Sequence, residues 1–301
     1  MLKLNHQFSL TIEEAFKEFL NSKKAKGISD KTIATYSQHF SAVSYNLDTA
    51  SEISNLTKKD LEAMIVGLQK RELSPNSIRS YTATFQSFLS WCKEEGYANI
   101  SIPLYKGKET IKDTYTNDEL KKLLAKPDLK KCSFPDYRNW VIVNMLLNSG
   151  CRASTIRFIL QKDVSLDEGF IRYRHTKNGS VQIVPLCQEM RKILKEYMRA
   201  RGGTENDYLF PSQEDTQLTE NGLSEAIRRY NRSRGVSKTS IHLFRHSYAE
   251  RYLRAGGDPF TLQRILGHST LDMTKHYCQL YDVDIVRHYD ELSPLQRMKL
   301  T

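Results

Sequence analysis

Apolar residues recur at helical spacing through the first hundred residues. Ile12, Phe16 and Phe19 would lie on one face of a helix, and similar runs follow with polar residues between them. Each run begins after a Ser or Thr that can cap a helix, and these start signals stand at Thr11, Ser29, Thr57 and Ser74. Gly27 and Gly96 end the first and the fourth run. The pattern predicts a bundle of four short amphipathic helices.

This periodicity stops after the bundle. Residues 105–115 include Gly107 and show no regular apolar spacing, which is typical of a linker between domains. We therefore expect a first domain over 1–104, a linker over 105–115 and a second domain over 116–301.

The second domain shows mainly helical patterns. Thr116 and Glu119 form a capping box, which opens its first helix. Helices are expected at about 117–125, 136–149, 187–201, 219–233, 241–254, 259–266 and 270–280, with a tail helix from 284.

One stretch of the second domain predicts strands. The sequence GFIRYRHTKNGSVQIVPL, residues 169–186, consists of two β-branched and aromatic runs joined through Asn178-Gly179, which is a hairpin signal. The expected fold class is mainly α with a small antiparallel β-hairpin or sheet in the second domain, an α+β arrangement.

Length and composition fit two globular domains. A chain of 301 residues can bury two cores, and 39% hydrophobic with 27% charged residues is ordinary for a soluble protein. The chain has no uninterrupted apolar run of membrane-spanning length, and its first residues do not read as a secretion signal. We expect a cytoplasmic protein with no membrane partner.

The five cysteines are never spaced as CxxC, so we expect no disulfide framework, metal or other cofactor.

Positive charge is concentrated in the second part of the chain. The net charge is +10; residues 1–104 contain 12 Lys and Arg against 11 Asp and Glu, whereas residues 105–301 contain 33 against 24. Such an excess suits a polyanion such as nucleic acid, because each neutralised phosphate releases counterions. A basic protein without such a partner has the same composition, so charge alone leaves both interpretations open.

Six residues are candidates for chemistry on a phosphate. His242 and Arg245 stand at i and i+3 in HLFRHSYAE and would project from one helix face, whereas His246 lies on another face and is interpreted as structural. The other candidates are Arg152 after Gly150, Lys177 at the hairpin tip, His268 after Gly267, and Tyr277. Taken singly, each has an ordinary explanation as a surface, turn, capping or packing residue.

Taken together, these residues can act on a phosphodiester. Two arginines, a lysine and two histidines can surround it with fixed positive charge, which stabilises the charge that builds on its oxygens during phosphoryl transfer. Tyr277 supplies a hydroxyl nucleophile, whose free pKa of about 10 requires a base and a cationic field. The clustered cations would take the part that Mg²⁺ plays elsewhere.

The motifs SGCR, TKNG, HLFR and LGHS follow one another in this order, and a tyrosine stands nine residues after the last histidine. This arrangement closely resembles that of the tyrosine recombinases, the lambda-integrase and Xer-like family. The resemblance spans about residues 115–285, and SDKTIATYSQHF in the first domain is similar to the family's core-binding domain. It implies a SAM-like helical DNA-binding domain followed by a catalytic domain with a C-terminal tail helix.

The resemblance also implies a role for each candidate. Arg152 and Arg245 would clamp the scissile phosphate, and His268 would form a hydrogen bond with it. Lys177 would protonate the leaving 5′ oxygen, and His242 would act as base or proton relay. Tyr277 would attack and form a 3′-phosphotyrosyl link. Tyr281 and Tyr289 are competing nucleophile candidates, while His276 does not stand at the matching position.

One position departs from the family pattern. Three residues after the first arginine the family often has an acidic residue, whereas this chain has Thr155, which cannot offset charge. We therefore expect another group to orient Arg152 and the pocket to be more cationic than usual.

Partners follow from the same resemblance. The expected partner is double-stranded DNA, with the protein a monomer in free solution and a homotetramer on synapsed DNA, where the tail packs on a neighbouring subunit; accessory DNA-bending proteins fit this scheme. Lys31 and Arg79, near helix starts in the first domain, are candidates for phosphate contacts, although solvated surface positions explain them equally well.

Several functions are compatible with these motifs. The departure at Thr155 and the residues of the SGCR motif favour integration or excision of a mobile element or phage. Xer-like resolution of chromosome or plasmid dimers and a type IB topoisomerase share the same chemistry. A DNA-binding regulator with a decayed site is the alternative that is not an enzyme.

Overall fold

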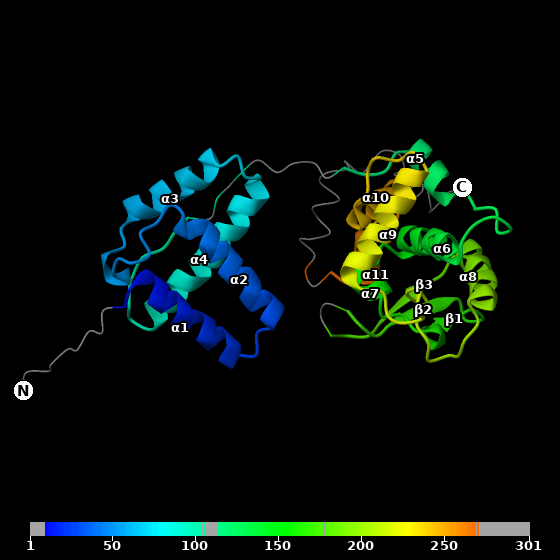
Figure 1. The fold of residues 1–301 in the computed structure, drawn as a ribbon, viewed down its shortest axis with the longest axis horizontal. Coiled ribbons are helices and arrows are strands. Elements are labelled where there is room, and N and C mark those ends of the chain that lie inside the picture. The colour runs from blue at the N-terminus through cyan, green and yellow to red at the C-terminus, as the bar shows by residue number, and fades with distance from the viewer. Residues whose placement is uncertain are drawn as a thin grey trace, which may run out of the picture. The chain divides into compact units, whose positions relative to one another are not determined.

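The computed structural model describes residues 10–103, 105, 107, 113–176, 179–268 and 270. The chain forms two compact units that divide after Thr110 (Figure 1). Both are mainly helical, and the second contains a small antiparallel sheet, so the expected fold class is confirmed. Several predicted residues lie outside the described ones: Lys177, Asn178, Tyr277, the alternative nucleophiles Tyr281 and Tyr289, and His276. The same holds for the tail helix and for the helix expected at 270–280 beyond residue 270.

The first unit is a helical bundle. Within residues 10–103 its elements are α1 (Ile12–Ala25), α2 (Asp30–Ser44), the 3₁₀ turn η1 (Ile53–Asn55), α3 (Lys58–Lys70) and α4 (Pro75–Glu94). The predicted start signals are confirmed, because the side chains of Thr11, Ser29, Thr57 and Ser74 each accept a hydrogen bond from a backbone N–H of the first turn. Local sequence thus sets where these helices begin.

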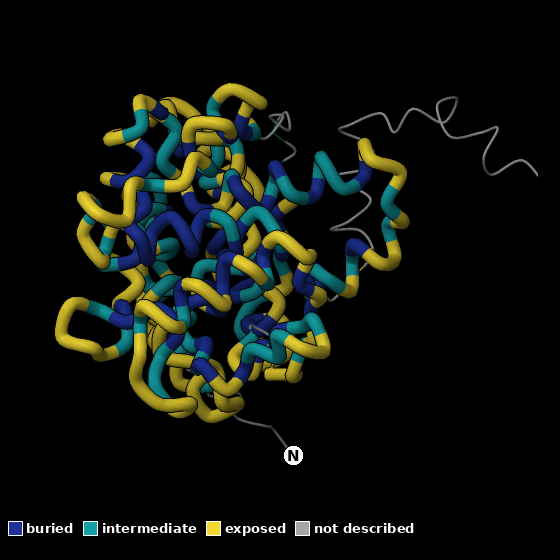
Figure 2. Tube along the Cα trace, turned by 90° about the vertical axis from the view of Figure 1, so that its right-hand side faces the viewer, coloured by how far each residue is buried: buried dark blue, intermediate teal, exposed yellow. Residues whose placement is uncertain are grey.

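Aromatic rings fill the core of this bundle. The Phe16 ring on α1 stacks on Phe40 of α2 with centroids 3.8 Å apart, and it meets the edge of Phe88 on α4 at 5.3 Å. Helix α4 contacts each of the other three helices. Along the chain trace in Figure 2, short buried stretches in dark blue are followed by exposed ones in yellow, as amphipathic helices require.

The second unit surrounds one buried helix, α6. Its helices are α5 (Asn117–Leu124), α6 (Phe134–Ser149), α7 (Ala153–Ile156), η2 (Gln161–Asp163), α8 (Gln188–Arg201), α9 (Glu220–Ser233), α10 (Ile241–Arg254) and α11 (Pro259–Leu266). Helix α6 contacts α5, α8, α9 and α10, and its residues from Tyr137 to Val143 are all buried. A helix that is buried all round forms the centre of a core. The helices predicted between 187 and 266 are confirmed within one residue at each end.

The sheet is larger than the sequence indicates. Strands β1 (Val164–Ser165), β2 (Phe170–Tyr173) and β3 (Gln182–Pro185) pair antiparallel in the order β1-β2-β3. Because the β2–β3 pairing ends at Tyr173 and Gln182, residues 174–181 separate the strands. The two predicted strands are confirmed as β2 and β3, and β1 is a strand that the sequence did not predict.

Candidate active site

The turn between α6 and α7 places Arg152 at the start of a helix, as the sequence predicts. Gly150 ends α6 in the left-handed conformation with φ of 59°, and a Cβ there would lie 2.6 Å from the Leu266 side chain and 2.7 Å from Tyr248. Only glycine combines this backbone conformation with so close an approach. The chain then passes directly beside α11, and Arg152 caps α7.

The hydroxyl and thiol groups beneath this turn are buried. The Tyr173 hydroxyl donates to Ser149 Oγ at 2.9 Å, and Ser149 Oγ donates to the Met145 carbonyl at 2.9 Å. Burial raises the pKa of the Tyr173 hydroxyl and of the Cys151 thiol above their usual values. Both groups therefore stay neutral and support the turn without adding charge.

Arg245 on α10 is buried, with 7% of its surface exposed. Its Nη1 donates to the Gly150 carbonyl at 2.8 Å, and its Nη2 donates to the Leu266 carbonyl at 3.0 Å. One guanidinium thus joins the end of α6 to the end of α11. A planar group with parallel donors suits this double contact.

Arg152 reaches the same end of α11. Its Nη2 donates to the Gly267 carbonyl at 3.2 Å. Gly267 caps α11 in the left-handed conformation, and the carbonyls at a helix carboxyl end carry partial negative charge. The sequence predicts that a group other than the residue at 155 orients Arg152. The Gly267 carbonyl, which accepts this hydrogen bond, is such a group.

His268 follows immediately and is also buried, with 8% of its surface exposed. Its backbone N–H donates to the Gln263 carbonyl at 3.1 Å. The structure therefore brings three of the sequence-predicted residues, Arg152, Arg245 and His268, to the carboxyl end of α11.

A cleft of about 430 Å³ opens beside these residues. Its lining consists of Arg152, Thr176, Ser180, Val181, Gln182, Ile183, Arg264, Gly267 and His268. The β2–β3 loop closes on itself here, since Thr176 Oγ1 donates to the Ser180 carbonyl at 2.7 Å. Lys177 lies outside the described residues; Thr176, which precedes it, and Ser180, three residues after it, line this cleft.

The base of this loop is anchored to the body of the second unit. Arg174 Nε donates to the Asp163 carboxylate at 2.5 Å, and the His175 ring stacks on Phe158 with centroids 3.8 Å apart. These contacts set where the loop leaves the sheet.

The remaining predicted residues are placed as follows. His242 lies in the first turn of α10, three residues before Arg245, and is exposed, while His246 is half-buried. Thr155 on α7 is 4% exposed, and its backbone N–H donates to the Arg152 carbonyl at 3.0 Å. Lys31 on α2 and Arg79 on α4 are exposed in the first unit.

Gln182 is a residue that sequence reasoning missed. It lies on β3, and its Nε2 donates to the Arg264 carbonyl at 2.6 Å and to the Ile265 carbonyl at 2.5 Å. A glutamine in a strand carries no motif, and its partners are more than eighty residues away in sequence. Nothing in the sequence alone could have indicated this contact.

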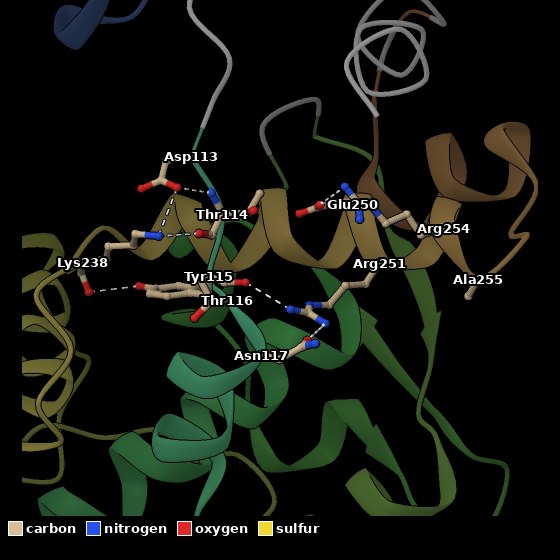
Figure 3. A pocket seen from close by; sticks show the side chains of 10 residues that line it. All are labelled: Asp113, Thr114, Tyr115, Thr116, Asn117, Lys238, Glu250, Arg251, Arg254 and Ala255. Atoms are coloured by element: carbon tan, nitrogen blue, oxygen red, sulfur yellow. Dashed lines mark hydrogen bonds and ion pairs between the residues drawn. The ribbon is translucent and has the colours of Figure 1, made fainter. Parts of the chain in front are cut away.

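A second cleft, of about 620 Å³, contains none of the predicted site residues (Figure 3). It follows the segment Asp113–Asn117, whose first three residues the sequence analysis assigns to the linker and which packs along α10. Arg251 Nη2 donates to the Tyr115 carbonyl at 3.1 Å, and Lys238 Nζ donates to the Thr114 carbonyl at 2.8 Å. Burial disfavours the charged form of Lys238, but hydrogen bonds to Asp113 and Glu119 outweigh it and raise its pKa. The groups in this cleft are thus engaged in holding the segment.

None of the helices in the described parts of the chain has both the length and the apolar character needed to cross a bilayer. The same residues include no cluster of three or more His, Cys, Asp or Glu side chains placed to hold a metal ion.

Two family models match the chain. Residues 114–283 match the phage integrase family, and residues 14–100 match the phage integrase N-terminal SAM-like domain. Among curated relatives, tyrosine recombinase XerD of Staphylococcus haemolyticus is 26% identical over 94% of this chain and 99% of its own length. Tyrosine recombinase XerA of Saccharolobus solfataricus is 27% identical over 92% of this chain and 91% of its own.

Solved structures share the fold. The Tn1549 transposon integrase in complex with transposon right end DNA has a TM-score of 0.76 at 16% identity, covering 89% of this chain and 94% of its own. A lambda integrase tetramer bound to a Holliday junction has a TM-score of 0.72 at 19% identity, covering 90% of this chain and 78% of its own. The XerA recombinase crystal structure has a TM-score of 0.51 at 25% identity, covering 94% and 99%.

Proposed function

Since the chain belongs to the phage integrase family, we propose that it is a site-specific recombinase that cleaves and rejoins double-stranded DNA through a 3′-phosphotyrosyl intermediate. The observation that carries this proposal is the convergence of Arg152, Arg245 and His268 on the carboxyl end of α11, beside the loop that contains Lys177. Fixed cations of this kind stabilise the charge that develops on a reacting phosphate.

In the proposed reaction Tyr277 attacks the scissile phosphorus. A bond forms between the tyrosine oxygen and phosphorus, and the bond from phosphorus to the 5′ oxygen breaks. His242 takes the phenolic proton, either as base or as relay, and Lys177 protonates the leaving 5′ oxygen. One phosphodiester replaces another, so the 5′ hydroxyl of a second strand can reverse the step without an external energy source.

Arg152, Arg245 and His268 bind the non-bridging oxygens in this scheme. The two guanidiniums neutralise the charge that grows on those oxygens, and His268 donates a hydrogen bond. Carbonyls hold both arginines before DNA arrives, so little reorganisation is needed when the phosphate binds.

We further propose that the first unit binds DNA, with Lys31 and Arg79 contacting phosphates, and that four copies assemble on synapsed DNA. A lambda integrase tetramer of the same fold on a Holliday junction supports the assembly. Sedimentation should show a monomer of 34.9 kDa in free solution and a tetramer on joined sites. Loss of each phosphate contact by substitution with Ala should lower the salt dependence of DNA binding by about one counterion.

The substitution Tyr277→Phe tests the reaction. It leaves no hydroxyl to attack, so we expect covalent complex formation to fall by at least about 10³-fold. The assay is trapping of the protein on fragmented host and element DNA, followed by sequencing of the attached ends. Tyr281→Phe and Tyr289→Phe should retain activity. Equal covalent trapping by Tyr277→Phe and the unsubstituted protein would assign the nucleophile to another tyrosine, whereas no covalent complex with either protein would favour the regulator alternative.

The sequenced ends also separate two biological roles. Our proposal is integration or excision of a mobile element, which places the ends at element boundaries. Resolution of chromosome or plasmid dimers is the second candidate, favoured by Xer relatives that match nearly end to end, and it places them at one site of the replicon. Relaxation of any supercoiled plasmid by the monomer would instead indicate a type IB topoisomerase.

A further inference from the structure

Gln182 joins the sheet to the carboxyl end of α11. Its side-chain amide has two N–H groups, and its nitrogen contacts two successive carbonyls, those of Arg264 and Ile265, at 2.6 and 2.5 Å. The last carbonyls of a helix lack partners within the helix. Gln182 therefore adds donors from β3 to the Ile265 carbonyl and to the Arg264 carbonyl, which also accepts the Gly267 backbone N–H at 3.2 Å.

The next two carbonyls of the chain hold the proposed phosphate-binding arginines. Arg245 donates to the Leu266 carbonyl and Arg152 to the Gly267 carbonyl. Four successive carbonyls, from 264 to 267, thus bind side chains from three separate parts of the second unit. A shift of this end of α11 would displace Arg152 and the adjoining His268 together.

Gly267 provides the room that Gln182 occupies. Its φ is 62°, and a Cβ at this position would lie 2.9 Å from Gln182 Oε1. The left-handed backbone conformation favours glycine here, and the Gln182 amide packs directly against it. The contact between β3 and α11 is therefore tightly packed at the point where the arginines bind.

Resting on the proposed function, we propose that Gln182 is a positioning residue for phosphate binding. It fixes the carboxyl end of α11 and thereby holds Arg152 and His268 in register with the non-bridging oxygens. A displacement of about 1 Å in such a group can slow a reaction by on the order of 10²-fold.

The substitution Gln182→Met tests this proposal, because it keeps the length of the side chain and removes both donors. The substrate is a duplex with the mapped site, and the measurement is the rate of covalent complex formation at saturating protein. We expect at least about a tenfold lower rate on the ordinary phosphodiester, with DNA affinity unchanged.

A methylphosphonate at the scissile position separates positioning from folding. It replaces one charged non-bridging oxygen with a methyl group, so less charge needs neutralising. The defect of Gln182→Met should shrink to about two- to threefold on this substrate.

Gln161→Met is the matched control. Gln161 Nε2 also donates to two carbonyls, those of Gly202 at 2.8 Å and Thr204 at 3.0 Å, in another part of the second unit. We expect this variant to unfold at lower urea concentration than the unsubstituted protein. The ratio of its cleavage rates on the phosphodiester and methylphosphonate substrates should equal that of the unsubstituted protein.

Three results would overturn the positioning role of Gln182. The first is a rate for Gln182→Met equal to that of the unsubstituted protein, and the second is an equal defect on both substrates. The third is a defect that is relieved only by a sulfur at the bridging 5′ position, because this would place the effect on the leaving group. Failure of the unsubstituted protein to form a Tyr277-dependent complex would instead overturn the proposed function.

Discussion

The carboxyl end of α11 and the corner between η2 and β2 hold arginines in different ways. At α11, Arg245 and Arg152 donate to backbone carbonyls. At the corner, Arg174 donates to the carboxylate of Asp163, which is 1% exposed. A carbonyl orients a guanidinium without cancelling its charge, whereas a carboxylate neutralises it. The first arrangement suits binding of an anion, and the second suits anchoring of a loop.

Among the substitutions that test this comparison, Arg245→Lys should have the largest effect. A single ammonium cannot reproduce the parallel contacts to the Gly150 and Leu266 carbonyls, and the phosphate loses an oriented donor. We expect cleavage to fall by about 10²- to 10³-fold, measured as covalent complex formation at saturating protein.

Arg174→Lys is the matched control for that substitution. An ammonium can still pair with the Asp163 carboxylate, so we expect cleavage to change by less than about threefold. Similar losses in both variants would mean that the two ways of holding arginine do not differ in function.

Asp163→Asn should lower stability. The carboxylate accepts from Arg174 and from the Leu160 backbone N–H at 3.0 Å, and the amide keeps the shape but loses the charge. Because Arg174 is half-exposed and partly screened by solvent, we expect a loss of about 1–2 kcal/mol in the free energy of unfolding. Urea denaturation measures this. An unchanged free energy of unfolding would contradict an anchoring role.

Thr155→Glu should have the smallest effect, on the salt dependence of DNA binding. A carboxylate next to the proposed phosphate site would repel DNA and offset one cation. The slope of log affinity against log salt concentration should become shallower by about 0.9. Thr155→Gln, of the same size but uncharged, is the control. An unchanged slope in the Glu variant would argue against an unusually cationic pocket.

Local signals in the sequence predicted most of the helices. The capping residues Thr11, Thr57 and Thr116 act within one turn, so the helices that they open follow from neighbouring residues. The placement of Arg152 at a helix start was predicted for the same reason: Gly150 ends one helix and the next begins directly after it.

Contacts between distant segments could not be predicted in this way. Strand β1 has two residues and no periodicity; it exists because Val164 and Ser165 pair with Ile171 and Phe170. The Arg245 contact to Gly150 joins residues 95 positions apart. The motifs indicated Arg152, Arg245 and His268 as candidates, but the carbonyls that hold the two arginines belong to the backbone, which is the same in every sequence.

The segment Asp113–Asn117 has a practical consequence for shortened forms of this protein. The Tyr115 backbone N–H donates to Ser247 Oγ at 2.8 Å, and its ring lies 4.5 Å from that of Phe244, the neighbour of Arg245. A fragment that begins at Thr116 would uncover Phe244 and leave Ser247 without this bond. Limited proteolysis or truncation should therefore yield a well-folded second unit only when the new amino terminus lies upstream of Asp113.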